Sequence, residues 1–147
     1  CRRIKQMGYP VKLDTNGSRP EVLQRLFDQA LVDYVAMDVK TDPHHYSPTI
    51  CRQKNPASVL DSIDLIMAAA PAYEFRTTCV RPLVDGRVVE RIAQRIAGAR
   101  LYALQHFEDA CVLHPEYFRD PHPGFDPEEL ERLRDIAAPY VQRCIIR

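Results

Sequence analysis

Apolar and polar residues follow strand-like patterns in four segments of the chain. Aliphatic and charged residues alternate in "VKLDT" (11–15), "LVDYVAMDVK" (31–40) is almost continuously apolar, "AYEFRTTCV" (72–80) is rich in aromatic and β-branched residues, and "ARLYALQHF" (99–107) is the fourth segment. Alternation with a period of two indicates a strand with one buried face, and a continuous apolar run indicates a strand covered on both faces. We therefore predict four β-strands.

Helices are expected in the intervals between these strands. They are predicted over about 19–29, from Asn55-Pro56 to about Ala70, and up to Gly98. Asn16-Gly17 is a turn pair, and Ser18 with Glu21 three residues later has the spacing of a capping box for the first helix. In the second helix, Val59, Ile63, Ile66 and Met67 recur at helical spacing and would face the sheet. Strands that alternate with such helices predict βαβ units and a parallel sheet.

The two ends of the chain depart from this alternation. "CRRIKQMGYP" (1–10) reads as a helix end that closes on Gly8, so we expect the chain to be part of a longer protein. Beyond residue 108 the sequence is loop-like until Asp126-Pro127 and Glu129 begin a capped helix, and "VQRCIIR" fits a final edge strand. We expect one domain over 1–147, with βα units in 1–108 and a tail in 109–147.

Each predicted strand has one polar face. These faces carry Lys12 and Asp14, then Asp38 and Lys40, then Glu74 and Arg76, and finally Gln105. Because the apolar faces must lie under the helices, the polar faces should meet at the carboxyl ends of the parallel strands, where such folds place their binding sites. Unpaired buried ions cost several kcal/mol each, which favours a site for a charged ligand.

Simpler interpretations exist for each of these residues. Asp14 could cap its own turn, Asp38 and Lys40 could form an ordinary ion pair, and Arg76 could neutralise a neighbouring carboxylate. If the residues do form a site, two carboxylates suit a hard cation or an ammonium group, whereas lysine and arginine suit a carboxylate or phosphate. An amino acid moiety carries both charges. The sequence has no glycine-rich phosphate loop and no GxGxxG motif, so a conventional nucleotide site is not supported.

Composition excludes several other classes. Lysine plus arginine equals aspartate plus glutamate at 20 each, so no net field draws the chain to nucleic acid or to an anionic membrane. No apolar run approaches the roughly 20 residues of a membrane span and no signal peptide is visible, which favours a cytoplasmic protein.

The cysteines and histidines give only a weak metal signal. The cysteines are Cys1, Cys51, Cys79, Cys111 and Cys144, which are odd in number and too widely spaced for a CxxC motif, so reduced thiols are expected. His106, Cys111 and His114, or His44 and His45, have ligand-like spacing for zinc, but such residues are more often found in loops or at the surface.

Three stretches taken together carry a family resemblance. "KLDTNGSRPEVL", "LVDYVAMDVK" and "YEFRTT", in this order and spacing, closely resemble the radical S-adenosylmethionine enzymes that activate anaerobic ribonucleoside-triphosphate reductase, with pyruvate formate-lyase activating enzymes as relatives. The match extends through "LYALQHF" and to "CIIR". It implies an α/β fold, the C-terminal portion of a partial (βα)₆ barrel whose parallel strands have outer helices and bind S-adenosylmethionine at their carboxyl ends.

The resemblance also implies roles for individual residues. Asp14, Thr15 and Asp38 would line the methionyl end of the cofactor, around a monovalent cation in the activating-enzyme relatives, and Asn16 would be a further cofactor-binding residue. Lys40 would pair with the cofactor's carboxylate. Arg76 and Gln105 match strand-end positions that face cofactor or substrate.

The family's CxxxCxxC and glycine-glycine-glutamate motifs do not occur in this sequence. No two cysteines are closer than the 28 positions from Cys51 to Cys79, so the ligands of a [4Fe–4S] cluster would lie outside this chain, which alone should not catalyse. The family uses a reductant such as flavodoxin or ferredoxin, cleaves S-adenosylmethionine to a 5′-deoxyadenosyl radical, and abstracts hydrogen from a glycine of a partner glycyl radical enzyme. Two alternatives stay open: a radical S-adenosylmethionine enzyme with a small-molecule substrate, and a cluster-free fragment that binds a ligand or a protein.

Overall fold

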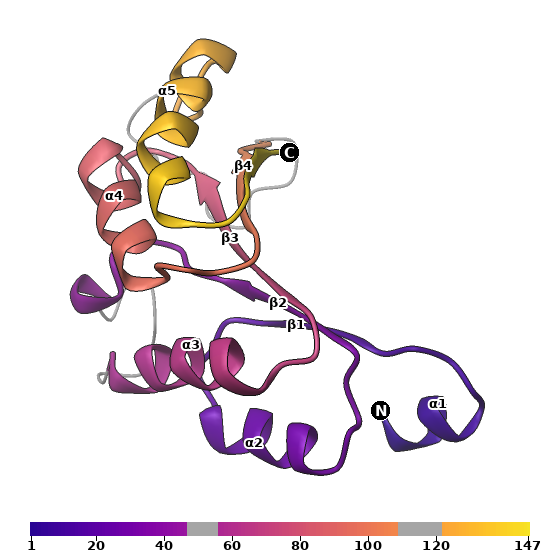
Figure 1. Ribbon diagram of the computed structural model, residues 1–147. Helices are drawn as coiled ribbons and strands as arrows, with labels where there is room; N and C mark the ends of the chain where they lie inside the picture. The colour runs from indigo at the N-terminus through magenta and orange to yellow at the C-terminus, as the bar shows by residue number, and fades with distance from the viewer. Residues whose placement is uncertain (47–55, 109–121) are drawn as a thin grey trace.

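A five-stranded parallel sheet forms the centre of the protein (Figure 1). The computed structural model describes residues 1–46, 56–108 and 122–147. The strands are β1 (Lys12–Thr15), β2 (Tyr34–Asp38), β3 (Tyr73–Cys79), β4 (Tyr102–His106) and β5 (Cys144–Ile146). They lie side by side in chain order, and every adjacent pair is parallel. The prediction of four adjacent parallel strands and a C-terminal edge strand is confirmed.

A helix lies between each pair of successive strands, as predicted, and one further helix precedes the first strand. The helices are α1 (Arg2–Gln6), α2 (Pro20–Asp28), α3 (Ala57–Ala69), α4 (Gly86–Arg95) and α5 (Pro127–Ala137), with short 3₁₀ turns η1 (Pro43–His45) and η3 (Ala138–Tyr140). The first helix ends just before Gly8, whose φ of 84° is the left-handed conformation expected of a glycine that closes a helix. None of the helices in the described residues is long and apolar enough to cross a membrane.

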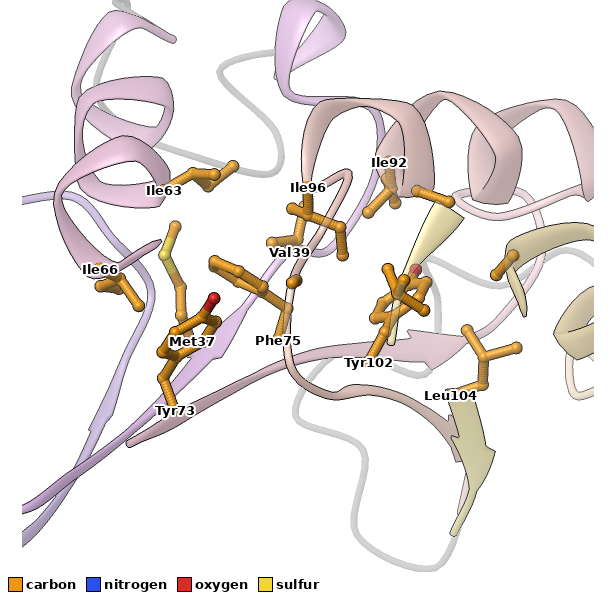
Figure 2. Packing of buried hydrophobic residues seen from close by; sticks show 14 of the residues in the cluster. Met37, Val39, Ile63, Ile66, Tyr73, Phe75, Ile92, Ile96, Tyr102 and Leu104 are labelled. Carbon is orange, nitrogen blue, oxygen red and sulfur yellow. The ribbon is translucent and has the colours of Figure 1, made fainter. Parts of the chain in front are cut away.

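The helices α2 to α5 lie along one face of the sheet (Figure 1). Strand residues such as Met37, Phe75 and Tyr102 point toward Ile63 of α3 and Ile92 of α4, and all five are fully buried (Figure 2). The core is therefore formed by the apolar faces of the strands and the apolar stripes of the helices. This leaves the polar strand positions on the opposite face, as the alternation predicted.

The turn after β1 is fixed by the core beneath it. Gly17 adopts a φ of 71°, which favours glycine, and a methyl group at this position would overlap the side chain of Met37. The buried Ser62 hydroxyl of α3 donates a hydrogen bond to the Gly17 carbonyl at 2.8 Å. The turn that follows Asp14 is thus anchored to both β2 and α3.

One predicted helix cap is wrong and another is confirmed. Helix α2 begins at Pro20, so Arg19 takes the N-cap position and makes no side-chain cap, while the Ser18 amide donates to Asn16 Oδ1 at 3.0 Å. The proline fixes the first helical position, which puts Ser18 one residue too early to cap it. At α5, by contrast, the Asp126 and Glu129 capping box is formed in both directions. Asn55, at the predicted start of the second helix, lies outside the described residues, and Pro56 holds the N-cap position of α3.

Candidate functional site

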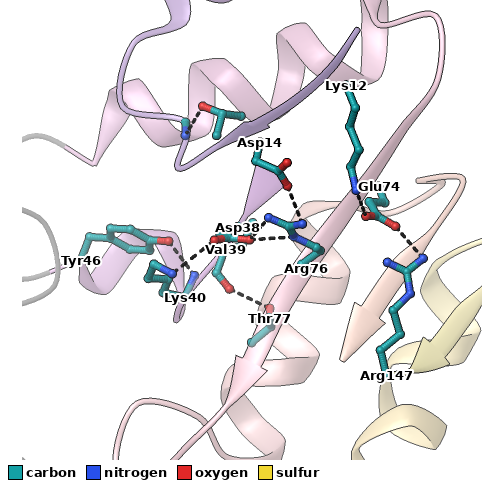
Figure 3. A network of polar contacts seen from close by, with 12 residues as sticks. Lys12, Asp14, Asp38, Val39, Lys40, Tyr46, Glu74, Arg76, Thr77 and Arg147 are labelled. Carbon is teal, nitrogen blue, oxygen red and sulfur yellow. Dashed lines mark hydrogen bonds and ion pairs between the residues drawn. The ribbon is translucent and has the colours of Figure 1, made fainter. Parts of the chain in front are cut away.

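Three charged side chains from neighbouring strands meet on the face of the sheet opposite helices α2 to α5 (Figure 3). Arg76 of β3 lies between two aspartates, with Nη1 2.6 Å from Asp14 Oδ1 and Nη2 2.8 Å from Asp38 Oδ1. Asp14 belongs to β1, so the arginine reaches across β2 to contact it. Ala36 is the β2 residue opposite Asp14, and its small side chain leaves room for this crossing.

Lys40 extends this cluster just beyond the end of β2. Its Nζ lies 3.3 Å from Asp38 Oδ2. The side chain of Arg76 is 15% exposed, whereas Asp38, Lys40 and Asp14 are 30%, 46% and 57% exposed, so the cluster opens to solvent at the carboxyl ends of the strands. The predicted convergence of Asp14, Asp38, Lys40 and Arg76 is confirmed, and their role in binding stays a prediction.

The charges of the cluster compensate one another. Burial alone would lower the pKa of Arg76, but hydrogen bonds and charge from Asp38 and Asp14 outweigh burial and raise that pKa above its ordinary value. Two carboxylates face two cations, so the simpler interpretation, in which Arg76 neutralises a neighbouring carboxylate, is confirmed, and a charged ligand stays a prediction. The cluster presents solvent-accessible groups of positive and negative charge to a ligand.

The turn residues Thr15 and Asn16 border the cluster. Thr15 Oγ1 accepts a hydrogen bond from the Gly17 amide at 3.1 Å, and Asn16 Oδ1 accepts one from the Ser18 amide. Both residues line a pocket of about 460 Å³, together with Asp14, Asp38 and apolar residues of α2. Their side-chain oxygens shape the turn and also border the space beside Asp14.

Gln105 is the predicted site residue that the structure does not bring into the cluster. It lies on β4 opposite Thr78, and by strand alternation it faces the same side of the sheet as Arg76. Within the described part of the chain, no hydrogen bond joins its side chain to the cluster. The neighbouring His106 lines a second pocket, of about 600 Å³, with Arg81, Phe125 and Glu129.

Glu74 is a polar interior residue that sequence analysis placed on the correct face but did not select. Its side chain is 1% exposed, and it lies between Lys12 Nζ at 3.6 Å and Arg147 Nη2 at 2.8 Å (Figure 3). These contacts are ion pairs, since neither carboxylate oxygen has a hydrogen bond of good geometry among the described residues. Burial alone would raise the pKa of Glu74, but Arg147 and Lys12 outweigh burial and lower it. Strand alternation was the only sequence signal for this residue.

The zinc alternative receives little support from the described residues. Cys111 and His114 lie outside them, and no group of three or more His, Cys, Asp or Glu side chains within them could hold a metal ion. Cys79 and Cys144 are free thiols, and burial raises their pKa values to about 12 and about 11.

Comparison with known proteins gives one sequence relative and one structural neighbour of interest, and no family model matches the chain. A Methanocaldococcus jannaschii protein, named as a glycyl-radical enzyme activating enzyme, is 37% identical over 153 residues that cover all of this chain. The match covers 62% of that protein, so the chain spans about six-tenths of its relative's length.

The structural neighbour is a crystal structure of a domain of pyruvate-formate lyase-activating enzyme from Bacteroides vulgatus. The two share 16% sequence identity with a TM-score of 0.74, and the alignment covers 99% of this chain and 85% of that domain. At this identity the comparison shows the fold. The predicted architecture of parallel strands with helices on one face is therefore shared with an activating-enzyme domain.

Proposed function

We propose that this chain is the C-terminal part of a radical S-adenosylmethionine activase, an enzyme that generates a glycyl radical on a partner protein. The observation that carries the proposal is the 37% identity, along the whole chain, with a protein named as a glycyl-radical enzyme activating enzyme. The shared fold with an activating-enzyme domain supports it. The charged strand ends supply a site of suitable chemistry in the position where parallel α/β folds bind ligands.

The residues of the cluster fit the methionyl end of S-adenosylmethionine. That end carries an ammonium group and a carboxylate, and the cluster presents Asp14 and Asp38 for the ammonium or a monovalent cation, and Lys40 for the carboxylate. Arg76 keeps the two aspartates together, and Thr15 and Asn16 border the same pocket. Gln105 would face the cofactor or substrate from β4.

When S-adenosylmethionine is bound and reduced by a [4Fe–4S] cluster, it is the source of the group that abstracts a hydrogen atom. The cysteine ligands of the [4Fe–4S] cluster would come from outside this chain, and a flavodoxin or ferredoxin would supply the electron. The contribution of this chain would be to bind the methionyl end, orient it and limit the access of water. We further propose anaerobic ribonucleoside-triphosphate reductase as the partner protein, because of the motif resemblance.

The test is cofactor binding by the complete protein reconstituted with its cluster under anaerobic conditions. Lys40→Ala should weaken S-adenosylmethionine binding by about 2 kcal/mol, the low end for losing a partner of a desolvated carboxylate, because Lys40 is half-exposed. Asp38→Asn should act in the same direction. The yield of 5′-deoxyadenosine after reduction should fall with affinity.

Asp61→Asn on the exposed surface of α3 is the matched control. It should change affinity by no more than a few tenths of a kcal/mol, since isolated surface charges contribute little. Unchanged affinity in both Lys40→Ala and Asp38→Asn would refute the cofactor site. Incubating the active protein with the reductase, and detecting a glycyl radical by electron paramagnetic resonance, tests the partner separately.

A further inference from the structure

The peptide group between Val39 and Lys40 is held at both of its polar atoms. The Val39 carbonyl accepts a hydrogen bond from Thr77 Oγ1 at 2.7 Å, and the Lys40 amide donates one to the Tyr46 hydroxyl at 2.8 Å (Figure 3). Both atoms belong to one planar unit, so fixing both sets the orientation of its plane. This peptide joins Val39, which follows Asp38, to Lys40.

The Thr77 hydroxyl is itself held by a hydrogen bond from the buried Tyr102. The Tyr102 hydroxyl donates to Thr77 Oγ1 at 2.8 Å, and the two residues are 0% and 1% exposed. Burial raises the pKa of Tyr102, so its hydroxyl keeps the proton that it donates. Thr77 accepts this bond and is left with its own proton for the Val39 carbonyl. The hydrogen bonds thus run in one direction from β4 through β3 to the end of β2, and such chains strengthen one another.

These contacts extend the order of the sheet beyond the last residue of β2. The strand ends at Asp38, after which the Val39 amide donates to the Arg76 carbonyl at 2.8 Å and Lys40 has left the ladder. Without a further restraint, the side chain of Lys40 could turn away from Asp38. The two hydrogen bonds on the Val39–Lys40 peptide fix the direction in which the Lys40 side chain leaves the backbone, and Lys40 Nζ lies 3.3 Å from Asp38 Oδ2.

We propose that Thr77 and Tyr102, together with Tyr46, are positioning residues for the cofactor site. They hold the Val39–Lys40 peptide so that Asp38 and Lys40 present opposite charges in a fixed arrangement. The inference rests on the proposed function of that site. A binding site needs such support because its groups must be held within about 0.5 Å of their working positions.

Two substitutions at position 77 separate positioning from packing. Thr77→Val keeps the shape of the side chain and removes the hydroxyl, whereas Thr77→Ser keeps the hydroxyl and removes a buried methyl group. Affinity for S-adenosylmethionine should therefore fall in Thr77→Val and be kept in Thr77→Ser. Thermal stability should fall in Thr77→Ser as well, because a buried methyl group is lost. Tyr102→Phe removes the supporting donor. Its control is Tyr73→Phe, which removes a hydroxyl from a tyrosine that is 5% exposed on the same face of the neighbouring strand.

The experiment measures two quantities in the complete protein with its cluster. Dissociation constants for S-adenosylmethionine are determined anaerobically, and hydrogen–deuterium exchange of peptides that include Lys40 is followed without cofactor. Thr77→Val should weaken binding by about 10-fold, as losses of supporting hydrogen bonds do at other ligand sites, and should speed exchange at Lys40 by a similar factor. Tyr102→Phe should shift both in the same direction by less, and Thr77→Ser and Tyr73→Phe should stay within about 2-fold.

The outcomes distinguish this inference from the function on which it rests. Weaker binding in Lys40→Ala with unchanged binding in Thr77→Val overturns the positioning role alone. Unchanged binding in Lys40→Ala, Asp38→Asn and Thr77→Val overturns the proposed cofactor site, and the positioning role falls with it. Equal losses of affinity in Thr77→Val and Thr77→Ser would show that packing matters and the hydroxyl does not, which also overturns the inference.

Discussion

Replacing Gly17 by alanine should destabilise the protein strongly. The first cost is conformational, because a φ of 71° is unfavourable for an L-residue with a side chain by about 1–2 kcal/mol. The second is steric, because the new methyl group would overlap Met37 Cε and lie 3.1 Å from its Sδ. Met37 is fully buried, so a shift of its side chain would press on the surrounding core, and such overpacking costs about 1–3 kcal/mol. Together these effects should lower the free energy of unfolding by about 2–5 kcal/mol.

Gly98→Ala is the matched control for the steric part. Gly98 has a φ of 84°, but no described atom lies within 4 Å of the added methyl group. The control should lose only the conformational part, about 1–2 kcal/mol. Urea unfolding followed by far-ultraviolet circular dichroism measures both losses in the same protein.

A second variant tests whether Met37 is the cause. Leucine at position 37 lacks the terminal methyl group that would overlap and by itself should cost less than about 1.5 kcal/mol. In the Met37→Leu background, the loss caused by Gly17→Ala should approach that of Gly98→Ala. Equal losses for Gly17→Ala and Gly98→Ala in the original background would refute the argument that the core fixes this turn.

Two further predictions concern charge and capping. The pKa of Glu74 is lower in the folded state than its ordinary value of 4.5, so the ionised carboxylate stabilises the fold. This stabilisation is fully present above pH 4.5 and is lost as the pH falls below 4.5 through the folded pKa. Glu74→Gln should therefore destabilise the protein more at pH 7 than in acid below pH 4.5, measured by urea unfolding at both pH values. Asp126→Ala should cost about 1 kcal/mol by removing the capping box of α5, whereas Ser18→Ala, which removes no cap, should stay within about 0.5 kcal/mol in thermal unfolding.

The arrangement of strands and the polar face could be predicted from sequence because both follow from local spacing. Alternation in β1 and β3 assigned Asp14 and Arg76 to one face, and a parallel sheet in chain order brought their strand ends together. The pairing of individual charges could not be predicted. Arg76 reaches Asp14 past Ala36, a small residue of the intervening strand, and this contact depends on the register of three strands.

Other features could not be predicted because two start signals competed for one helix, or because the contacts join residues far apart in the sequence. Ser18 had the spacing of a cap, but Pro20 set the start of the helix instead. The hydrogen bonds from Tyr102 to Thr77 and from Thr77 to Val39 join three strands through side chains that in sequence resemble ordinary core residues. Such contacts are visible only after the strands have been placed side by side.

The pairing of Glu74 with Arg147 has a consequence for biosynthesis. A ribosome makes the chain from the amino end, so Asp14, Asp38 and Arg76 can neutralise one another as soon as β3 has emerged. Glu74 emerges at the same stage, but its closest cation is the last residue of the sequence printed here. Until Arg147 arrives, Lys12, which is more distant, is the cation among the described residues that pairs with that carboxylate. A nascent chain stalled before β5 should therefore keep Glu74 hydrated and the middle of the sheet loosely packed, and the addition of β5 should consolidate both.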